Sequence, residues 1–305
     1  MHTKFYGWIK AFRIQFLVAS ILPVLLGTIL AKLFTNQFNF FYFILTLIGV
    51  MFLHLGTNVL NDYFDYLNNT DNINTEYSPG FSGGSRVLQQ GLLTLGEVLL
   101  GAIVLFCLSL IIGIYLAYNI SWIVLLFGFA GIFFSFAYSF FKNSFFVGEI
   151  LVGLFFGLLI PLGAYFVQTT KFSLEILIFS IPFILVLFLI LWINEFVDYK
   201  ADKLTGKKTM VVRIGRKKAS VIYNLTVIII FFYVINLGFL LNIYFFILFI
   251  LALPLALKSM SQLYSFYDEP AKMKVCIPLT IAMYLFFSGV LLIGLLFYGG
   301  RLLLH

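Results

Sequence analysis

Asparagine and carboxylate side chains are concentrated in two short stretches of an otherwise apolar sequence. The first, here called the first motif, covers residues 61–71 and has the sequence NDYFDYLNNTD. If a helix continues through its beginning, Asp62 lies three residues and Asn61 four residues before Asp65, so the three side chains share one face. Asn58 lies four residues before Asp62 and extends this face, and Asp71 adds a further acid. The pattern predicts an acidic helix face.

The second motif covers residues 194–202 and has the sequence NEFVDYKAD. Asn194, Asp198 and Asp202 follow one another at four-residue steps, and Glu195 lies three residues before Asp198, so all four occupy a narrow sector of one helix. Carboxylates this close repel one another, and a divalent cation removes the repulsion. Oxygen ligands without His or Cys favour Mg²⁺, which usually binds through a few carboxylates and substrate phosphates.

Two magnesium-loaded acidic faces opposite each other would form a clamp for a diphosphate group. We therefore predict that Asp62, Asp65, Asp198 and Asp202 are catalytic and that Mg²⁺ is the cofactor. An acidic helix end can also be a solvated cap. However, a charge inside a membrane helix costs about 2.5–3.5 kcal/mol, and two equivalent motifs favour a function. The candidate substrate-binding residues near the motifs are Asn58, Asn61, Arg86, Lys142, Asn194, Lys207 and Lys208.

The helices that carry these motifs must lie in lipid. Of the 305 residues, 62% are hydrophobic and only 10% are charged, far from the quarter that is usual in soluble domains. At roughly 20 residues per span, the sequence predicts an all-α polytopic membrane protein that forms a single domain over residues 1–305. The nine expected spans are 14–33, 38–60, 95–117, 120–141, 146–168, 172–193, 220–238, 240–257 and 276–298.

The distribution of basic residues predicts the orientation. With the N-terminus in the cytoplasm, sixteen of the nineteen Lys and Arg residues fall on the cytoplasmic side, and only Lys32, Lys171 and Arg301 fall outside. The net charge of +7 therefore reflects topology, and we expect no nucleic-acid partner. The prediction is a multi-pass protein of a prokaryotic cell membrane whose active site faces the cytoplasm.

Two long polar segments, 61–94 and 195–219, follow the second and the sixth expected spans. Four spans separate their parent helices, and an even number gives two halves of the same orientation. We therefore expect two four-helix units plus a ninth helix. Each unit would place its motif at the same side of the membrane.

The two motifs resemble those of the UbiA superfamily of intramembrane prenyltransferases, and the similarity covers nearly the whole chain. The resemblance implies a nine-helix bundle that uses magnesium and a polyprenyl diphosphate. It also implies two metal sites: Asn61, Asp62, Asp65 and Asp71 would bind one Mg²⁺, and Asp198 and Asp202 the other.

Further segments are similar to the branch of the superfamily that prenylates 1,4-dihydroxy-2-naphthoate. These are GEILVGLFFGLLIPLGAYFVQT at 148–169, GKKTMVVRIGR at 206–216, and Arg13, Pro23 and Gly27, which resemble the first helix of that branch. By this resemblance Glu149 and Tyr165 would contact the aromatic acceptor or its cavity. The second motif departs from the branch, because naphthoate enzymes commonly have an Asn-Arg-Asp type of sequence where this chain has Asn194-Glu-Phe.

Two kinds of alternative remain. A prenyltransferase with another acceptor, such as 4-hydroxybenzoate, a homogentisate-like ring or a glycerol lipid, would use the same clamp. A cation-coupled transporter would instead use the acids as ion sites. Transporters usually place such sites near the bilayer midplane on broken helices of inverted repeats, whereas here the acids lie at one interface of a parallel repeat. We infer no obligate protein partner.

Overall fold

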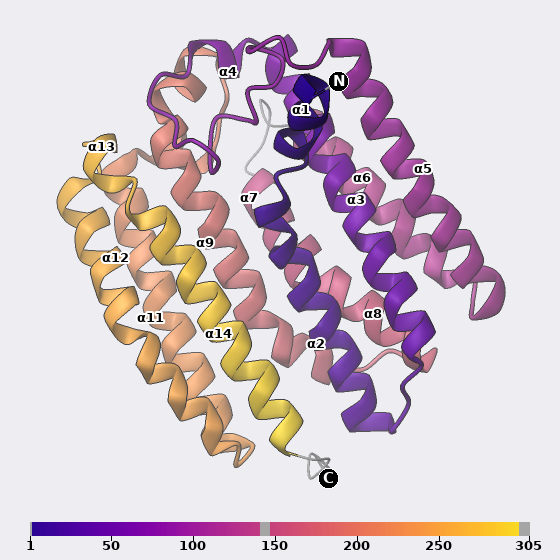
Figure 1. The fold of residues 1–305 in the computed structure, drawn as a ribbon. Helices are drawn as coiled ribbons and strands as arrows, with labels where there is room; N and C mark the ends of the chain where they lie inside the picture. The colour runs from indigo at the N-terminus through magenta and orange to yellow at the C-terminus, as the bar shows by residue number, and fades with distance from the viewer. Residues whose placement is uncertain (1, 141–146, 299–305) are drawn as a thin grey trace.

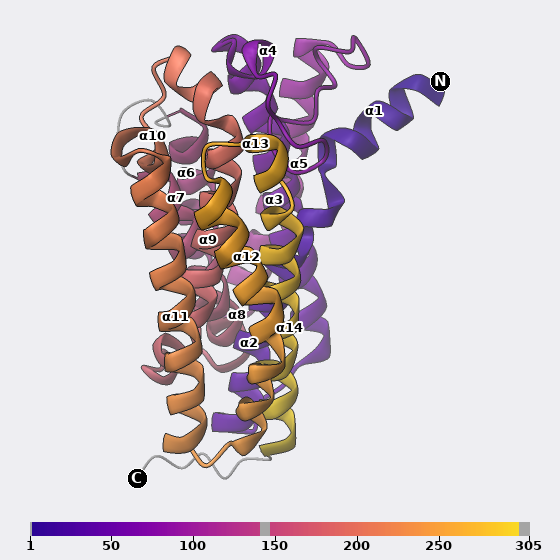
Figure 2. The same ribbon diagram turned by 90° about the vertical axis from the view of Figure 1, so that its left-hand side faces the viewer.

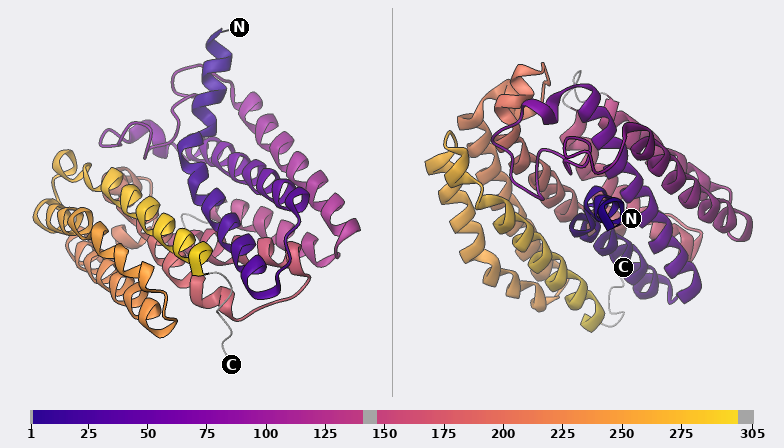
Figure 3. Two further views of the ribbon diagram at one scale, coloured as in Figure 1. Left: turned by 60° about the horizontal axis from the view of Figure 1, so that its bottom comes forward. Right: turned by 45° about the horizontal axis from the view of Figure 1, so that its top comes forward.

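The computed structural model describes residues 2–140 and 147–298, and these residues form a bundle of long helices without a strand (Figure 1). Helices α3, α5 and α6 lie along one side of the bundle, and α11, α12 and α14 lie along the other. Between them run α2, the α7–α8 segment and α9, and α2 packs directly against α8 while α9 packs against α14 (Figures 1 and 3). The elements are α1 (His2–Phe12), η1 (Ile14–Leu17), α2 (Val18–Thr35), α3 (Phe40–Leu67), α4 (Thr70–Ile73), α5 (Leu95–Asn119), α6 (Ile123–Phe140), α7 (Val147–Leu154), η3 (Phe155–Leu159), α8 (Ile160–Thr169), α9 (Glu175–Leu204), α10 (Met210–Ile214), α11 (Arg216–Leu240), η4 (Tyr244–Ala252), α12 (Leu253–Phe266), α13 (Pro270–Met273) and α14 (Cys276–Tyr298).

Within the described residues, eight helical segments are long and apolar enough to cross a membrane. They correspond to eight of the nine expected spans, so the prediction of an all-helical polytopic membrane protein is confirmed. The expected span 120–141 corresponds to Ile123–Ala137, which is apolar but shorter than the other eight. The count of nine and the division into two four-helix units plus one helix therefore remain predictions.

Helices α3 and α9 are the two that carry the motifs, and both are longer than a bilayer is thick. Their 28 and 30 residues span about 42 and 45 Å at 1.5 Å per residue, against a hydrocarbon core of about 30 Å. Each helix therefore extends beyond the apolar region, and each extension carries acids, Asp62 and Asp65 on α3 and Asp198 and Asp202 on α9. Helix α3 continues into the first motif as far as Leu67, so Asn61, Asp62 and Asp65 lie on one helix, whereas Asp71 lies in the separate short helix α4.

The segment that faces α9 is interrupted by one turn of π-helix, η3. The backbone of η3 lies very close to α9: a Cβ atom on Gly157 would stand 2.4 Å from the backbone nitrogen of Ile184. Small residues allow such close approaches between membrane helices, and π-helical turns are frequent at functional sites because they shift the register of side chains. Here the turn directs Phe155 and Phe156 toward a cavity described below.

The loops that follow α3 and α9 cover the same end of the bundle, as Figure 2 shows for α4 and α10. Helix α1 also lies at this end and projects away from the bundle (Figure 2). The long loop after α4 returns to the membrane at α5, where the side chains of Thr94 and Glu97 form a capping box. Both polar segments of the chain are thus gathered at one end of the structure.

Candidate active site

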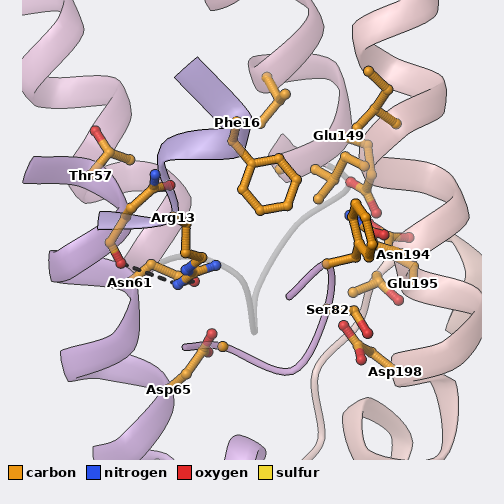
Figure 4. A pocket seen from close by; sticks show the side chains of 18 of the residues that line it. Arg13, Phe16, Thr57, Asn61, Asp65, Ser82, Glu149, Asn194, Glu195 and Asp198 are labelled. Carbon is orange, nitrogen blue, oxygen red and sulfur yellow. Dashed lines mark hydrogen bonds between the residues drawn. The ribbon is translucent and has the colours of Figure 1, made fainter. Parts of the chain in front are cut away.

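A cavity of about 200 Å³ opens between the two motifs. Its walls are formed by the last turns of α3, by α9, by α7 and η3, and by the loop that covers them (Figure 4). Asp65 and Asp71 line it from the first motif, and Asp198 and Asp202 line it from the second. Acids from both halves of the chain therefore converge on one space, as the sequence predicted.

Lys207 connects the two motifs. Its Nζ lies 2.9 Å from Oδ1 of Asp65 on α3 and 3.6 Å from Oδ1 of Asp202 on α9, and the side chain is only 6% exposed. Burial lowers the pKa of Lys207, but Asp65 and Asp202 outweigh this effect, so the pKa lies above its ordinary value. In the metal-free protein the ammonium group therefore stays charged and holds the two acidic faces together.

Asp62 lies behind the cavity wall rather than on it. Its carboxylate forms an ion pair with Arg13 and accepts hydrogen bonds from the hydroxyl and the backbone N–H of Ser85, the latter at 3.1 Å. Arg13 adopts the left-handed backbone conformation with a φ of 46° between α1 and η1, and its guanidinium also donates to Asn61 Oδ1 at 3.5 Å. Asn58 Nδ2 donates to the carbonyl of Phe12 at 3.1 Å, so α3 holds the start of the chain over the site.

The loop after the first motif is folded tightly against Asp71. A Cβ atom on Gly84, whose φ is 72°, would stand 2.0 Å from Oδ2 of Asp71, so only glycine fits there. Burial raises the pKa of Asp71 to about 6, and the charges of Asp65 and Asp62 contribute to the same increase. The cost of ionising these neighbouring acids is what a divalent cation would remove.

Asn74 and Arg86 hold this loop in place. Asn74 Nδ2 donates to Oδ1 of Asp198 at 2.7 Å, which ties the first loop to α9. Arg86 donates to the backbone carbonyls of Asp71 and Asn74, and its guanidinium lies 3.9 Å from the centre of the Tyr77 ring. Arg86 thus braces the loop from outside the cavity lining, and its predicted contact with phosphate stays a prediction.

Several other predicted residues are brought to the cavity, and others are not. Asn58, Asn61, Glu149 and Asn194 line it together with Lys207. Tyr165 is buried in α8 away from this cavity, and Lys208 is exposed in the loop before α10. Lys142 lies outside the described residues.

Sequence reasoning missed several residues that shape the site. Ser82 and Glu195 line the cavity, and Ser85 and Arg13 contact Asp62, but the spacing of residues in the sequence points to none of these roles. The distribution of charge could have pointed to the basic partners of the first motif. No Lys or Arg lies between Lys32 and Arg86, so the counter-charges of the motif must come from distant segments. They come from Arg13 for Asp62 and from Lys207 for Asp65.

The donor set fits magnesium, although no three described acidic, His or Cys side chains stand close enough to hold an ion by themselves. The cavity offers carboxylate oxygens from two walls, with His54 on its lining hydrogen-bonded to Ser20 at 2.7 Å. Mg²⁺ commonly takes one or two carboxylates and completes its shell with water and substrate phosphates. Asp65, Asp71, Asp198 and Asp202 are placed for this arrangement.

A bundle of membrane-spanning helices with two acidic motifs around one cavity defines a class of integral membrane enzyme. The model of the UbiA prenyltransferase family matches residues 20–287, and the chain belongs to this family. Relatives that the chain matches are named as prenyltransferases, and the chain spans less than two thirds of the length of several of them.

The relatives and the solved structures agree on this assignment. A 1,4-dihydroxy-2-naphthoate octaprenyltransferase of Bacillus subtilis is 28% identical over 208 residues, which cover 67% of this chain and 64% of that protein. A UbiA homologue from Aeropyrum pernix, solved in its apo form, superposes with a TM-score of 0.69 at 15% identity over 93% of this chain and 98% of that one. A UbiA homologue from Archaeoglobus fulgidus, solved with GPP and Mg²⁺, gives a TM-score of 0.57 at 13% identity over 93% of this chain and 99% of that one.

Proposed function

We propose that the enzyme transfers a polyprenyl group from polyprenyl diphosphate to an aromatic acceptor, 1,4-dihydroxy-2-naphthoate, in a magnesium-dependent reaction. The observation that carries this proposal is the convergence of Asp65 and Asp71 with Asp198 and Asp202 on one cavity, with Lys207 between them. This arrangement suits a group that carries several negative charges and brings its own metal ligands.

The diphosphate would occupy the space between the acidic walls. Bound magnesium would neutralise the diphosphate and stabilise the charge that develops on the leaving oxygen. Lys207 would exchange one of its carboxylate partners for a phosphate oxygen, and its position between the two walls supports this role. Asn61, whose Nδ2 is buried and has no partner among the described residues, is a further donor on the cavity wall.

The cavity continues from the acids into an apolar part. Phe155 and Phe156 of η3 and Leu187 and Leu191 of α9 line this region. Once the carbon–oxygen bond to the diphosphate breaks, the allylic cation would lie among these aromatic and aliphatic side chains, where water cannot easily reach it. The hydrocarbon tail would extend between the helices toward lipid.

The choice of acceptor rests on the relatives. The Bacillus subtilis protein is named for 1,4-dihydroxy-2-naphthoate and octaprenyl transfer, and the sequence similarity of this chain is distributed over two thirds of its length. The positive-inside distribution of charge supports a cytoplasmic active site in a prokaryotic cell membrane.

The test uses membranes that contain the protein, magnesium, a labelled polyprenyl diphosphate and a panel of aromatic and glycerol-lipid acceptors. We expect a prenylated naphthoate product that disappears when magnesium is chelated. Asp65→Ala and Asp198→Ala should each abolish product while the protein still inserts and melts cooperatively. Turnover by both variants at the wild-type rate would refute the assignment of the acids, and exclusive turnover of another acceptor would refute the naphthoate assignment.

A further inference from the structure

Two glutamates on opposite sides of a helix interface meet at the cavity, and the diphosphate clamp does not use them. Glu149 lies near the start of α7 and Glu195 lies in the second motif on α9. Both line the cavity, and they are only 2% and 6% exposed. Figure 4 shows the two carboxyl groups together on one wall, beside Asn194.

Backbone groups hold both carboxyl groups in place. The N–H of Met210 donates to Glu149 at 2.7 Å, and the N–H of Val211 donates to Glu195 at 3.5 Å. A carboxylate accepts more than one hydrogen bond, and a carboxylate within hydrogen-bond reach of a hydroxyl group can also accept its proton.

The neighbouring Asn194 points to the kind of ligand that fits here. Its Oδ1 is buried and accepts no hydrogen bond from any described residue, although it belongs to a side chain on the cavity wall. A buried acceptor without a donor is costly, and the adjacent carboxyl pair also calls for a donor. A ligand that brings O–H groups to this wall would satisfy both. Phe16, which faces the wall across the cavity in Figure 4, offers an apolar surface for the ring that carries them.

We propose that Glu149, Glu195 and Asn194 form the subsite for the hydroxyl edge of the aromatic acceptor, and that the Glu149–Glu195 pair accepts the hydroxyl proton during prenyl transfer. This inference rests on the proposed function, because it names the group that activates the acceptor of that reaction. Glu195 has no assigned role in metal binding, and it lies on the wall of the cavity rather than in the clamp.

The step balances in atoms and electrons. The hydroxyl proton passes to the carboxylate, and the electron pair of the O–H bond moves into the ring. A ring carbon then forms the new carbon–carbon bond to C1 of the prenyl group, and the C1–O bond breaks with its electron pair leaving on the diphosphate. The resulting keto form returns to the aromatic form by moving the proton of the alkylated ring carbon to the oxygen through solvent. The proton held by the pair is finally released to water.

A merely structural role for the pair makes a different prediction. If the glutamates only hold the loop before α10, the amide oxygen of glutamine would accept the same two backbone N–H groups in nearly the same shape. Glutamine cannot accept the acceptor's proton, however. Glu195→Gln and Glu149→Gln therefore separate support of the loop from proton transfer.

The experiment compares these two variants and the double variant with wild type and with Glu269→Gln, a change at an exposed glutamate next to α13. Thermal melting with and without Mg²⁺ and geranyl diphosphate should give the same ligand-induced shift in every protein, since the clamp is intact. Prenyl transfer to a dihydroxynaphthoate should fall about 100-fold or more in the Glu149 and Glu195 variants, the usual range for loss of a general base, and stay unchanged in Glu269→Gln.

A series of acceptors with increasingly acidic hydroxyl groups provides the decisive measurement. The defect of Glu195→Gln should shrink along the series, because an acceptor that is already ionised needs no base. Transfer within twofold of wild type, or a defect of constant size along the series, would overturn the inference. A wild-type protein that binds Mg²⁺ and geranyl diphosphate but prenylates no aromatic acceptor would instead refute the proposed function. Should the double variant fold poorly, each single variant carries the same expectation.

Discussion

Lys207 holds the two acidic motifs together, and Lys207→Met would remove its charge while keeping the length of the side chain. At the observed distances of 2.9 and 3.6 Å to Asp65 and Asp202, the two attractions amount to about 6 and 5 kcal/mol at an effective dielectric constant of about 20. Part of this gain offsets the cost of burying the three charges. Breaking a buried pair therefore costs about 3–5 kcal/mol net, because two buried carboxylates lose the cation that they share.

This loss should be visible in the thermal unfolding of the purified protein in detergent. At roughly 2 °C per kcal/mol for a chain of this size, the Tm of metal-free Lys207→Met should fall by about 6–10 °C. Mg²⁺ should raise the Tm of the variant more than that of wild type, because the cation takes over the role of the missing ammonium group between the acids. The stabilisation by metal is thus expected to be larger in the less stable protein.

Lys208→Met is the matched control, since Lys208 is the next residue and its side chain is exposed. It should melt within about 1 °C of wild type, as surface substitutions usually do. The reasoning would be refuted if Lys207→Met melted like this control. It would also be refuted if Mg²⁺ shifted the Tm of Lys207→Met and wild type by the same amount.

Three other substitutions test separate parts of the structure. The pKa of Asp71 is raised to about 6 in the folded protein, so ionisation of this carboxyl group destabilises the fold as the pH rises from about 4 to 6. Asp71→Asn should therefore stabilise the metal-free protein by about 2–3 kcal/mol at pH 7.5 and leave its stability unchanged below pH 4. Chemical denaturation at the two pH values measures this difference. Gly84→Ala should weaken binding of Mg²⁺ and geranyl diphosphate at least tenfold by calorimetry, since its Cβ would stand 2.0 Å from Asp71 Oδ2. Gly27→Ala should lower the Tm by several degrees, because its Cβ would stand 2.1 Å from the carbonyl oxygen of Pro161, whereas Gly289→Ala, with nothing within 4 Å, should not.

The amino-acid sequence determined the class of the protein and the local geometry of the motifs. In lipid, a run of about 20 apolar residues can form its backbone hydrogen bonds within itself only as a helix. The positions of most spans therefore followed from the positions of the apolar runs. The spacing of Asp62 and Asp65, or of Asp198 and Asp202, is a property of a single helix, and it places each pair of side chains on one face without any tertiary contact. The expected span 120–141 corresponds to an apolar helix at the predicted position, Ile123–Ala137, which is shorter than the other eight.

Only the tertiary structure decided which charges meet. Asp62 is paired with Arg13, 49 residues away, and Asp65 with Lys207, 142 residues away, and Glu195 shares a cavity wall with Glu149 of another helix. No periodicity in the sequence encodes these partners, because they depend on how α3, α7 and α9 pack and on where the loops fold over them. Local spacing fixes the face of a helix, whereas the partner that compensates a buried charge is set by packing between segments distant in the chain.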